Sequence, residues 1–237
     1  MMTTTLHNAS NIQILYEDQD IILINKPGGL LSIADGYGSN LPHLKQILTP
    51  EFGEVWIVHR LDKDTSGVMV LARNAQAHRE LNESFRLRKI EKIYHGLVTP
   101  PPAWREMEMQ SPLQTNADRQ HRTRVSTSGG KPAYTICRVI KWFPLGVLTE
   151  IHIHTGISHQ IRAHLRAYDL ALLGDALYNA GLEPQPLTVP RTMLHARQIG
   201  FNHPLTGEWL SCAAPYPEDF RAAYTELRQT KALDEVI

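Results

Sequence analysis

Short apolar runs separated by polar turns dominate the first part of the chain. Residues 12–16 and 21–25 are rich in isoleucine and leucine, and the polar residues 17–20 separate them. Two such runs with a short polar connection predict a β-hairpin. The sequence Lys-Pro-Gly-Gly at 26–29 predicts the end of its second strand, because proline and glycine interrupt regular structure.

A strand, a helix and a further strand are predicted next. Residues 68–72 form an apolar run, and the following Asn74 is a residue type that favours the N-cap of a helix. Apolar residues then recur every four positions and share one helical face: Ala77, Leu81 and Phe85. This helix is expected to lead into a strand over residues 92–99.

Two more antiparallel pairs are predicted in the second half. Residues 133–143 and 147–154 are alternating or apolar runs joined by a short Pro-Leu-Gly turn, and residues 194–201 and 208–213 flank a second turn. Between the pairs, Ser158 is predicted to cap a helix that runs to about residue 168.

Hairpin-linked strands with helices inserted between them favour an α+β fold over a doubly wound parallel sheet. We expect a single mixed, mainly antiparallel β-sheet with flanking helices, formed by one domain over residues 11–237. Residues 1–10 are expected to be disordered, as chain termini often are.

Composition excludes several classes of protein. The chain has 237 residues, of which 42% are hydrophobic, so it can bury a sizeable core. It has neither a signal-peptide pattern at its start nor an apolar window of membrane-spanning length, and we therefore expect a cytoplasmic protein without a membrane partner. Two cysteines, Cys137 and Cys212, are too few for a disulfide framework, and we assign them no chemistry.

The charge is balanced overall but unevenly distributed. The chain has 24 basic and 24 acidic residues, whereas nucleic-acid-binding proteins usually have a basic excess. Residues 119–141, however, contain six basic residues and no acidic one. This basic run could attract phosphates, although a charge run is more often a solvated face.

The segment most informative for function is a polar loop that precedes the apolar run at 68–72. Residues 59–67 read His-Arg-Leu-Asp-Lys-Asp-Thr-Ser-Gly. A carboxylate on a loop at the mouth of a rigid strand is held in place and yet is accessible to substrate. The pattern H-R-L-D-x-x-T-S-G followed by an apolar strand resembles the signature of the RluA family of pseudouridine synthases, which places Asp62 at the catalytic position.

Further motifs of this family follow in the family's order, from about residue 12 to residue 215. Residues 14–29 resemble its opening hairpin with an N-K-P-x-G turn, and the other matches are K-x-Y at 92–94, K-x-A-x-T at 131–135, T-G-x-S-H-Q-I-R-x-H at 155–164, G-D-A-L-Y at 174–178 and L-H-A at 194–196. Several ordered motifs are a stronger signal than any one of them.

The resemblance implies the pseudouridine synthase fold and an isomerase that converts specific uridines of rRNA or tRNA stem-loops to pseudouridine. It implies Asp62 as the catalytic carboxylate, Tyr94 packed against the target base, and Arg162 paired with Asp62. No cofactor or metal is expected, and the protein is expected to act as a monomer. The target base has to be flipped out of its stack, and Arg60 beside Asp62 is placed to fill the space or to hold a phosphate.

The remaining RNA contacts are expected from basic or polar side chains near these motifs. They are His59, Arg86, Arg88, Lys89, Arg122, Arg124 and Lys131. Two other functions stay open at this point: an RNA-binding or RNA-folding module that keeps the fold without catalysis, and a glycoside hydrolase. A glycoside hydrolase normally needs a second carboxylate, and no partner for Asp62 is evident.

Two features of the sequence bear on the substrate. Where the family motif usually begins R-T-G-R, this chain has His154 and Ile157 in place of the arginines. No S4-type RNA-binding extension is expected before Asn11.

Histidines at 152, 154, 159 and 164 raise the possibility of a metal site. His159 and His164 do not share a helix face, however, and no cysteine or carboxylate completes a set, so we expect none.

Overall fold

The computed structural model describes residues 12–34, 41–182 and 185–230, so the predicted disorder of residues 1–10 concerns a segment outside the described residues. Contacts divide the chain into two compact units. Unit 1 comprises Met1–Glu91 and Ala196–Pro215, and unit 2 comprises Lys92–His195 and Tyr216–Ile237. No helix in the described ranges combines the length and the apolar character needed to cross a membrane.

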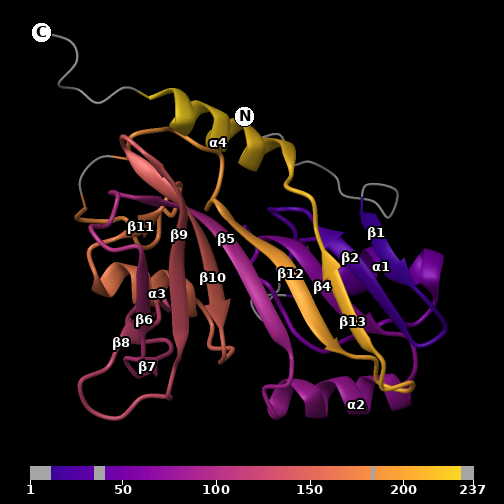
Figure 1. The fold of residues 1–237 in the computed structure, drawn as a ribbon. Helices are drawn as coiled ribbons and strands as arrows, with labels where there is room; N and C mark the ends of the chain where they lie inside the picture. Colours follow the sequence, from indigo (N-terminus) through magenta and orange to yellow (C-terminus); the bar gives the residue numbers. More distant parts are fainter. Residues whose placement is uncertain (1–11, 35–40, 183–184, 231–237) are drawn as a thin grey trace, which may run out of the picture. The chain divides into compact units, whose positions relative to one another are not determined.

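Unit 1 is built on strands in the order β1-β2-β4-β12 (Figure 1). The β1–β2, β2–β4, β3–β4 and β12–β13 pairs are antiparallel. Its strands are β1 (Gln13–Glu17), β2 (Ile21–Lys26), β3 (Trp56–Ile57), β4 (Ser66–Ala72), β12 (Leu194–Asn202) and β13 (Trp209–Ala213). Its helices are α1 (Leu44–Phe52) and α2 (Ala75–Arg86). Both predicted hairpins of this unit, β1–β2 and β12–β13, are confirmed.

The core of unit 1 lies around β2 and β4. Every residue of β4 is buried, and four consecutive apolar residues of β2 are completely buried. The predicted helix packs on β4 as α2, and Asn74 caps it as expected, because the Asn74 Oδ1 accepts a hydrogen bond of 2.9 Å from the Ala77 amide. Ala77 and Leu81 form its buried face.

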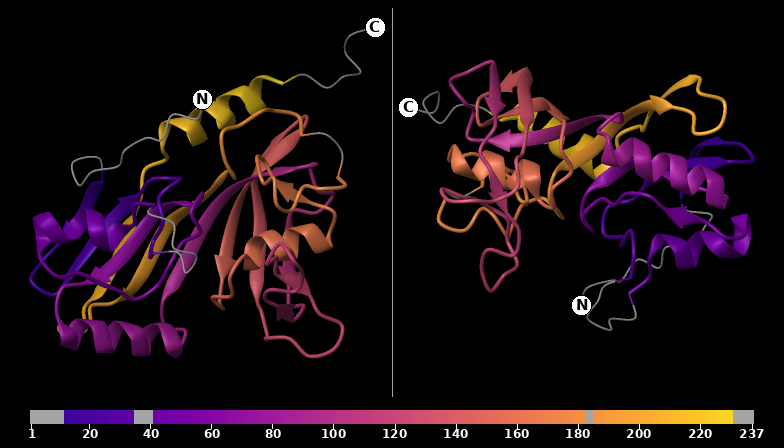
Figure 2. Two further views of the ribbon diagram at one scale, coloured as in Figure 1. Left: turned by 180° about the vertical axis from the view of Figure 1, so that it is seen from behind. Right: turned by 90° about the horizontal axis from the view of Figure 1, so that it is seen from below.

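Unit 2 has its strands in the order β5-β10-β9-β6, again antiparallel, with β11 paired to β5. Its elements are β5 (Glu91–Thr99), β6 (Glu106–Met109), β9 (Thr135–Phe143), β10 (Gly146–Ile153), β11 (Ala171–Leu172), the two-stranded sheet of β7 (Leu113–Gln114) and β8 (Arg124–Val125), α3 (Gln160–Ala167) and α4 (Glu218–Gln229). The predicted β9–β10 pair is confirmed, and α3 packs beside β8 (Figure 2). The expected α+β class with antiparallel strands and flanking helices is therefore correct.

The start of α3 differs from the prediction. The helix begins at Gln160, and its N-cap is His159 in the left-handed conformation, so the predicted cap at Ser158 is wrong by one residue. The buried Gln160 side chain organises this turn: its Oε1 accepts from the Thr155 hydroxyl at 2.7 Å and from the Ile157 amide at 3.2 Å. A side chain inside the helix thus satisfies a backbone amide that precedes it.

The buried side chain of Lys26 ties the end of β2 to the loop that precedes β4. Lys26 is 0% exposed. Its Nζ donates to three backbone carbonyl oxygens, those of Leu30 at 2.8 Å, Pro27 at 3.0 Å and Lys63 at 3.0 Å. The Gly29 amide donates to the same Lys63 oxygen at 2.9 Å. Because an ammonium group has three donor hydrogens, this cation anchors the loop at Lys63.

Replacing Lys26 with methionine should lower the free energy of unfolding by roughly 2–4 kcal/mol, because buried carbonyls lose a charged donor. Lys63→Met is the matched control: its side chain is exposed and its backbone carbonyl still accepts, so a change below about 0.5 kcal/mol is expected. Urea denaturation followed by circular dichroism measures both. Equally small losses in the two variants would show that the Lys26 ammonium does not hold the loop.

Candidate active site

Asp62 lies on the loop between β3 and β4 of unit 1, half-buried between the buried Leu61 and the exposed Lys63. The Thr65 amide donates to the Asp62 carbonyl at 3.1 Å, which closes a tight turn. The buried Ser32 hydroxyl donates to the Leu61 carbonyl at 2.8 Å and accepts from the Leu61 amide at 3.1 Å. Ser32 therefore fixes the backbone at Leu61, just before Asp62, and Lys26 fixes it at Lys63, just after Asp62.

His59 has a packing role at the start of the same loop. Its Nε2 accepts from the Val70 amide at 3.1 Å, and its ring stacks on Phe85 with centroids 4.7 Å apart. These contacts join β4 to α2 through the loop. The expected contact of His59 with RNA stays a prediction, as does that of Arg60, whose side chain is exposed.

Tyr94 and Arg162 both belong to unit 2. Tyr94 lies on β5 opposite Ile151 of β10, and it is 9% exposed. Arg162 lies on α3, where its Nε and Nη2 donate to the two carboxylate oxygens of Asp175 at 2.7 and 2.6 Å. Its guanidinium carbon also lies 4.7 Å from the centre of the Tyr178 ring. The expected pairing of Arg162 with Asp62 joins residues of different units and remains a prediction.

The contact of Asp175 with Arg162 was not predicted from the sequence. Asp175 belongs to the G-D-A-L-Y motif at 174–178, for which no contact was expected. The signal was the spacing of an aspartate and a tyrosine three residues apart in a motif that accompanies the arginine motif. What the sequence could not show is that a turn after β11 brings both side chains to α3.

The basic run at 119–141 is less positive in the structure than its sequence suggests. Asp118, immediately before the run, accepts from the Arg122 Nε at 2.7 Å and lies 2.8 Å from the Arg124 Nη2. Partial burial opposes the ionisation of Asp118, but the side-chain and backbone hydrogen bonds of Arg122 lower its pKa to about 2. One carboxylate therefore neutralises part of the charge of two arginines assigned to phosphates.

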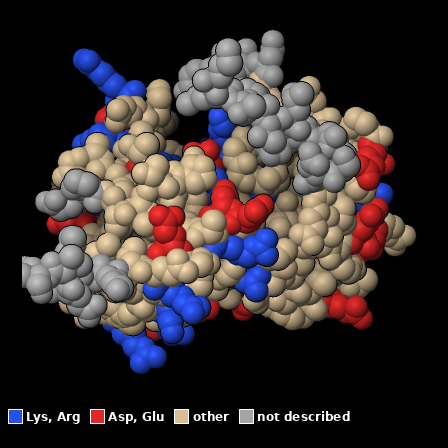
Figure 3. Space-filling model, turned by 90° about the horizontal axis from the view of Figure 1, so that it is seen from above, with Lys and Arg blue, Asp and Glu red and all other residues tan. Residues whose placement is uncertain are grey.

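Other predicted RNA contacts are exposed, and some are also paired. Arg86 donates to Glu83 on the same helix, which raises the pKa of Arg86. Arg88, Lys89 and Lys131 are exposed. In Figure 3, lysine and arginine side chains lie in separate groups on the face shown, with acidic side chains among them. On this face the two signs of charge are interspersed.

The two departures from the family motif have structural counterparts. His154 stacks on Tyr134, with ring centroids 4.7 Å apart and planes at 18°. Ile157 packs against the buried cluster of Leu113, Ala133, Ala163 and Tyr178. An aromatic pair and an apolar contact therefore occupy positions where the family usually has arginines.

Among the described residues, one group has the composition of a metal site: Asp18, Asp20 and His203 in unit 1. The Nδ1 of His203 accepts from the amides of Leu205 and Thr206 at 3.3 and 3.1 Å. The proton is therefore on Nε2, which lies 3.1 Å from the Asp18 Oδ2 and donates to it. Both ring nitrogens are engaged, so the group is a hydrogen-bonded turn.

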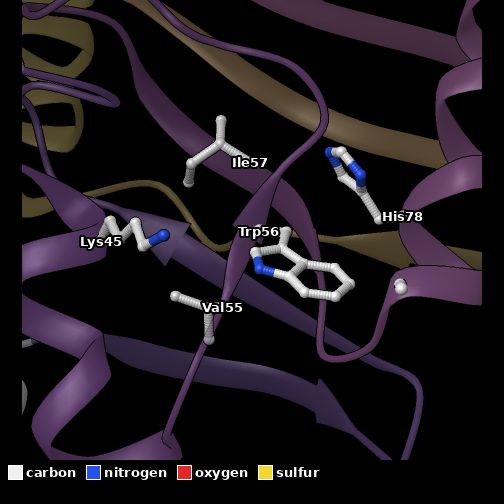
Figure 4. A pocket seen from close by; sticks show the side chains of 6 residues that line it. Lys45, Val55, Trp56, Ile57 and His78 are labelled. Atoms are coloured by element: carbon white, nitrogen blue, oxygen red, sulfur yellow. The ribbon is translucent and has the colours of Figure 1, made fainter.

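A hollow of about 310 Å³ lies beside β3, lined by Lys45, Val55, Trp56, Ile57, Ala75 and His78. Trp56 lies between Lys45 and His78, and its ring meets the His78 ring edge-on at 5.4 Å (Figure 4). The indole also hydrogen-bonds to Glu54, which lowers the pKa of that carboxyl group. The lining contains none of the predicted site residues.

Comparisons with known proteins agree with these motifs. The family model described as RNA pseudouridylate synthase matches residues 20–167. The chain is 36% identical to the dual-specificity RNA pseudouridine synthase RluA of Pasteurella multocida, over 86% of this chain and 93% of that protein. It is 32% identical to the ribosomal large subunit pseudouridine synthase D of Neisseria meningitidis, of which it spans 63%, over 94% of its own length.

A solved structure shows the same fold. Human RNA pseudouridylate synthase domain containing 4 superposes with a TM-score of 0.75 at 26% identity, over 91% of this chain and 92% of that one. Family model, relatives and structure agree on one chemistry, and they decide against a protein that only binds RNA and against a glycoside hydrolase. The chain belongs to the RNA pseudouridine synthase family and is an isomerase that acts on RNA.

Proposed function

We propose that this enzyme converts specific uridines in rRNA or tRNA stem-loops to pseudouridine, with Asp62 as its catalytic carboxylate. The observation that carries the proposal is the attachment of the Asp62 loop, which Ser32 and the buried Lys26 hold on either side of the carboxylate. A catalytic group has to be positioned by side chains that are themselves fixed, and this loop meets that condition. Residues 11–237 act as one monomeric catalytic domain, and these RNAs would place the enzyme in the cytoplasm.

The reaction needs one carboxylate and no redox step. The bond between uracil N1 and C1′ of the ribose breaks, the base rotates, and a bond forms between C5 and C1′. The proton on C5 leaves and N1 gains a proton, so the composition of the nucleotide does not change. Asp62 can attack C1′, attack C6 or support elimination to a glycal, and each route requires the ionised carboxylate beside the flipped nucleotide.

The other two site residues have complementary roles in this proposal. Tyr94 offers an aromatic face to the uracil ring and a polar end that can relay the C5 proton. The guanidinium of Arg162 orients the Asp62 carboxylate through a charge-assisted hydrogen bond. Arg60 occupies the space that the flipped base leaves or holds its phosphate.

Asp62→Asn should abolish turnover, with a fall of at least about 10³-fold in the single-turnover rate, because the isosteric amide is not a nucleophile. RNA affinity and the unfolding curve should stay close to those of the wild type. Asp64→Asn is the matched control, since Asp64 is exposed two residues further along the same loop, and its rate should stay within about threefold. Pseudouridine formation by Asp62→Asn within tenfold of the wild type at equal RNA occupancy would refute the assignment.

The pairing of Arg122 and Arg124 with Asp118 refines the expected salt dependence of RNA binding. If roughly 3 to 6 phosphates are contacted, log affinity should fall with log salt with a slope of about −2 to −5. Replacing both arginines with alanine should make the slope shallower by about one unit, because Asp118 already neutralises one of the two charges. Asp118→Asn should tighten binding and steepen the slope by up to about one unit.

Fluorescence anisotropy with a labelled stem-loop at several salt concentrations measures all three slopes. Arg166→Ala, at an arginine paired with Asp169, controls for the loss of a paired cation outside the basic run and outside the predicted contacts. A flat dependence for the wild type would show that shape and base contacts carry the affinity. An unchanged slope in Asp118→Asn would show that Arg122 and Arg124 do not reach phosphates.

A further inference from the structure

The guanidinium of Arg162 is held by side chains of its own unit. Its side chain is 11% exposed, and that of its partner Asp175 is 1% exposed. The two parallel hydrogen bonds, at 2.7 and 2.6 Å, match the fork of the guanidinium to both carboxylate oxygens. This geometry fixes the plane of the guanidinium as well as its position, which a single contact would not do.

Asp175 is itself fixed by the turn that follows β11. Its amide donates to the Leu172 carbonyl at 3.2 Å, and its Oδ1 accepts from the Tyr178 amide at 3.2 Å. The preceding Gly174 has φ +75, and a Cβ at that position would lie 2.0 Å from the Arg191 carbonyl oxygen. The turn therefore packs against the segment at Arg191 so closely that only glycine fits, and it cannot shift without breaking that contact.

Tyr178 holds the face of the guanidinium. The ring lies 4.7 Å from the Arg162 guanidinium carbon. Its hydroxyl accepts from the Thr123 amide at 2.8 Å and lies 3.0 Å from the Thr123 carbonyl, to which it donates. The ring is 4% exposed. A cation above a buried aromatic ring is attracted to its face, and the two anchoring bonds keep the ring from rotating away.

We infer that Asp175 is a positioning residue for the isomerisation, which acts through Arg162 by holding its guanidinium where the reaction requires it. The inference rests on the proposed role of Arg162 in the active site. A buried arginine with one carboxylate on its edge and one ring on its face has little freedom to move. Asp175 does not touch substrate in this assignment, so its effect should appear in the rate and hardly in RNA affinity.

The unit contains a matched control pair. Arg191 donates to both carboxylate oxygens of Asp219 at 2.6 and 2.8 Å, and the Arg191 side chain is 7% exposed. This pair ties the start of α4 to the segment before β12 and contains no predicted site residue. Asp175→Asn and Asp219→Asn thus each remove the charge of a bidentate carboxylate, which is 1% exposed in Asp175 and 32% exposed in Asp219. The Gly174 turn contacts the backbone carbonyl of Arg191 and not its side-chain pair with Asp219.

The test compares single-turnover pseudouridine formation at saturating enzyme, RNA affinity and the midpoint of thermal unfolding, with rates expressed per folded molecule. Asp175→Asn should lower the rate on the order of 10- to 100-fold, because a small displacement of a positioned group is costly, and should leave affinity within about threefold. Asp219→Asn should lower only the unfolding midpoint. Asp175→Glu keeps the charge beside Arg162, should remain folded even if Asp175→Asn does not, and should recover part of the rate.

A double-mutant cycle tests whether Asp175 acts through Arg162. In an Arg162→Lys background, which keeps a cation beside Asp175 but lacks the planar fork, Asp175→Asn should slow the reaction by less than about threefold. An equal loss in both backgrounds would overturn the inference, and so would an Asp175→Asn variant that loses stability and keeps its rate. Asp62→Asn in the same assay separates failure of the proposed function from failure of the inference about Asp175. If Asp62→Asn keeps its rate, the proposed function is refuted. If Asp62→Asn loses its rate while Asp175→Asn keeps its own, only the role of Asp175 is refuted.

Discussion

The buried ammonium of Lys26 is the interaction on which the geometry of the Asp62 loop depends. A lysine that is 0% exposed is tolerated because its donors meet backbone carbonyls. Two of those carbonyls belong to the turn after β2, and the third, Lys63, belongs to the loop that follows Asp62. The turn motif at 26–29 and the aspartate motif at 59–67 are therefore two parts of one structure.

A second constraint acts where the loop enters β4. Gly67 has φ +120, and a Cβ there would lie 2.2 Å from the Ala196 carbonyl oxygen. The first residues of β4 thus approach β12 more closely than any side chain permits, which explains why the loop motif ends in glycine. Ala196, in the L-H-A motif at 194–196, is only 4% exposed and supplies the backbone against which Gly67 packs. The loop that follows Asp62 is therefore held by an ammonium at Lys63 and by a close backbone contact at Gly67.

Much of this fold could be predicted where a local pattern decides the structure. The hairpins, β4, the Asn74 cap and the β9–β10 pair follow from periodicity and turn residues. Helix α4 was not predicted, although Phe220, Ala223 and Leu227 form its buried face at helical spacing. Helix α1 was missed as well, since Pro50 lies inside it. The error at Ser158 arose because Gln160, and not a capping hydroxyl, orders the turn before α3.

The sequence indicates candidate residues for the site but not their contacts. Three family motifs indicate Asp62, Tyr94 and Arg162 as candidates, but pairing depends on which distant segments meet. Asp118 lies one residue before the basic run at 119–141, so counting the charged residues of the run leaves out the carboxylate that pairs with Arg122 and Arg124. Asp175 is 13 positions from Arg162 and reaches it only through the turn after β11.

These pairings explain how a protein without net charge can act on RNA. Arginines that must be held in one orientation are paired with carboxylates: Arg162 with Asp175 and Arg191 with Asp219, each through two hydrogen bonds. Each such pair adds no net charge, so a balanced count of acids and bases says little about the local potential at exposed cations. Arg88, Lys89 and Lys131 are exposed and lie outside these pairs. In the proposed function, attraction to phosphates depends on a few such positions, while carboxylates such as Asp175 and Asp219 balance the net charge by pairing with buried arginines.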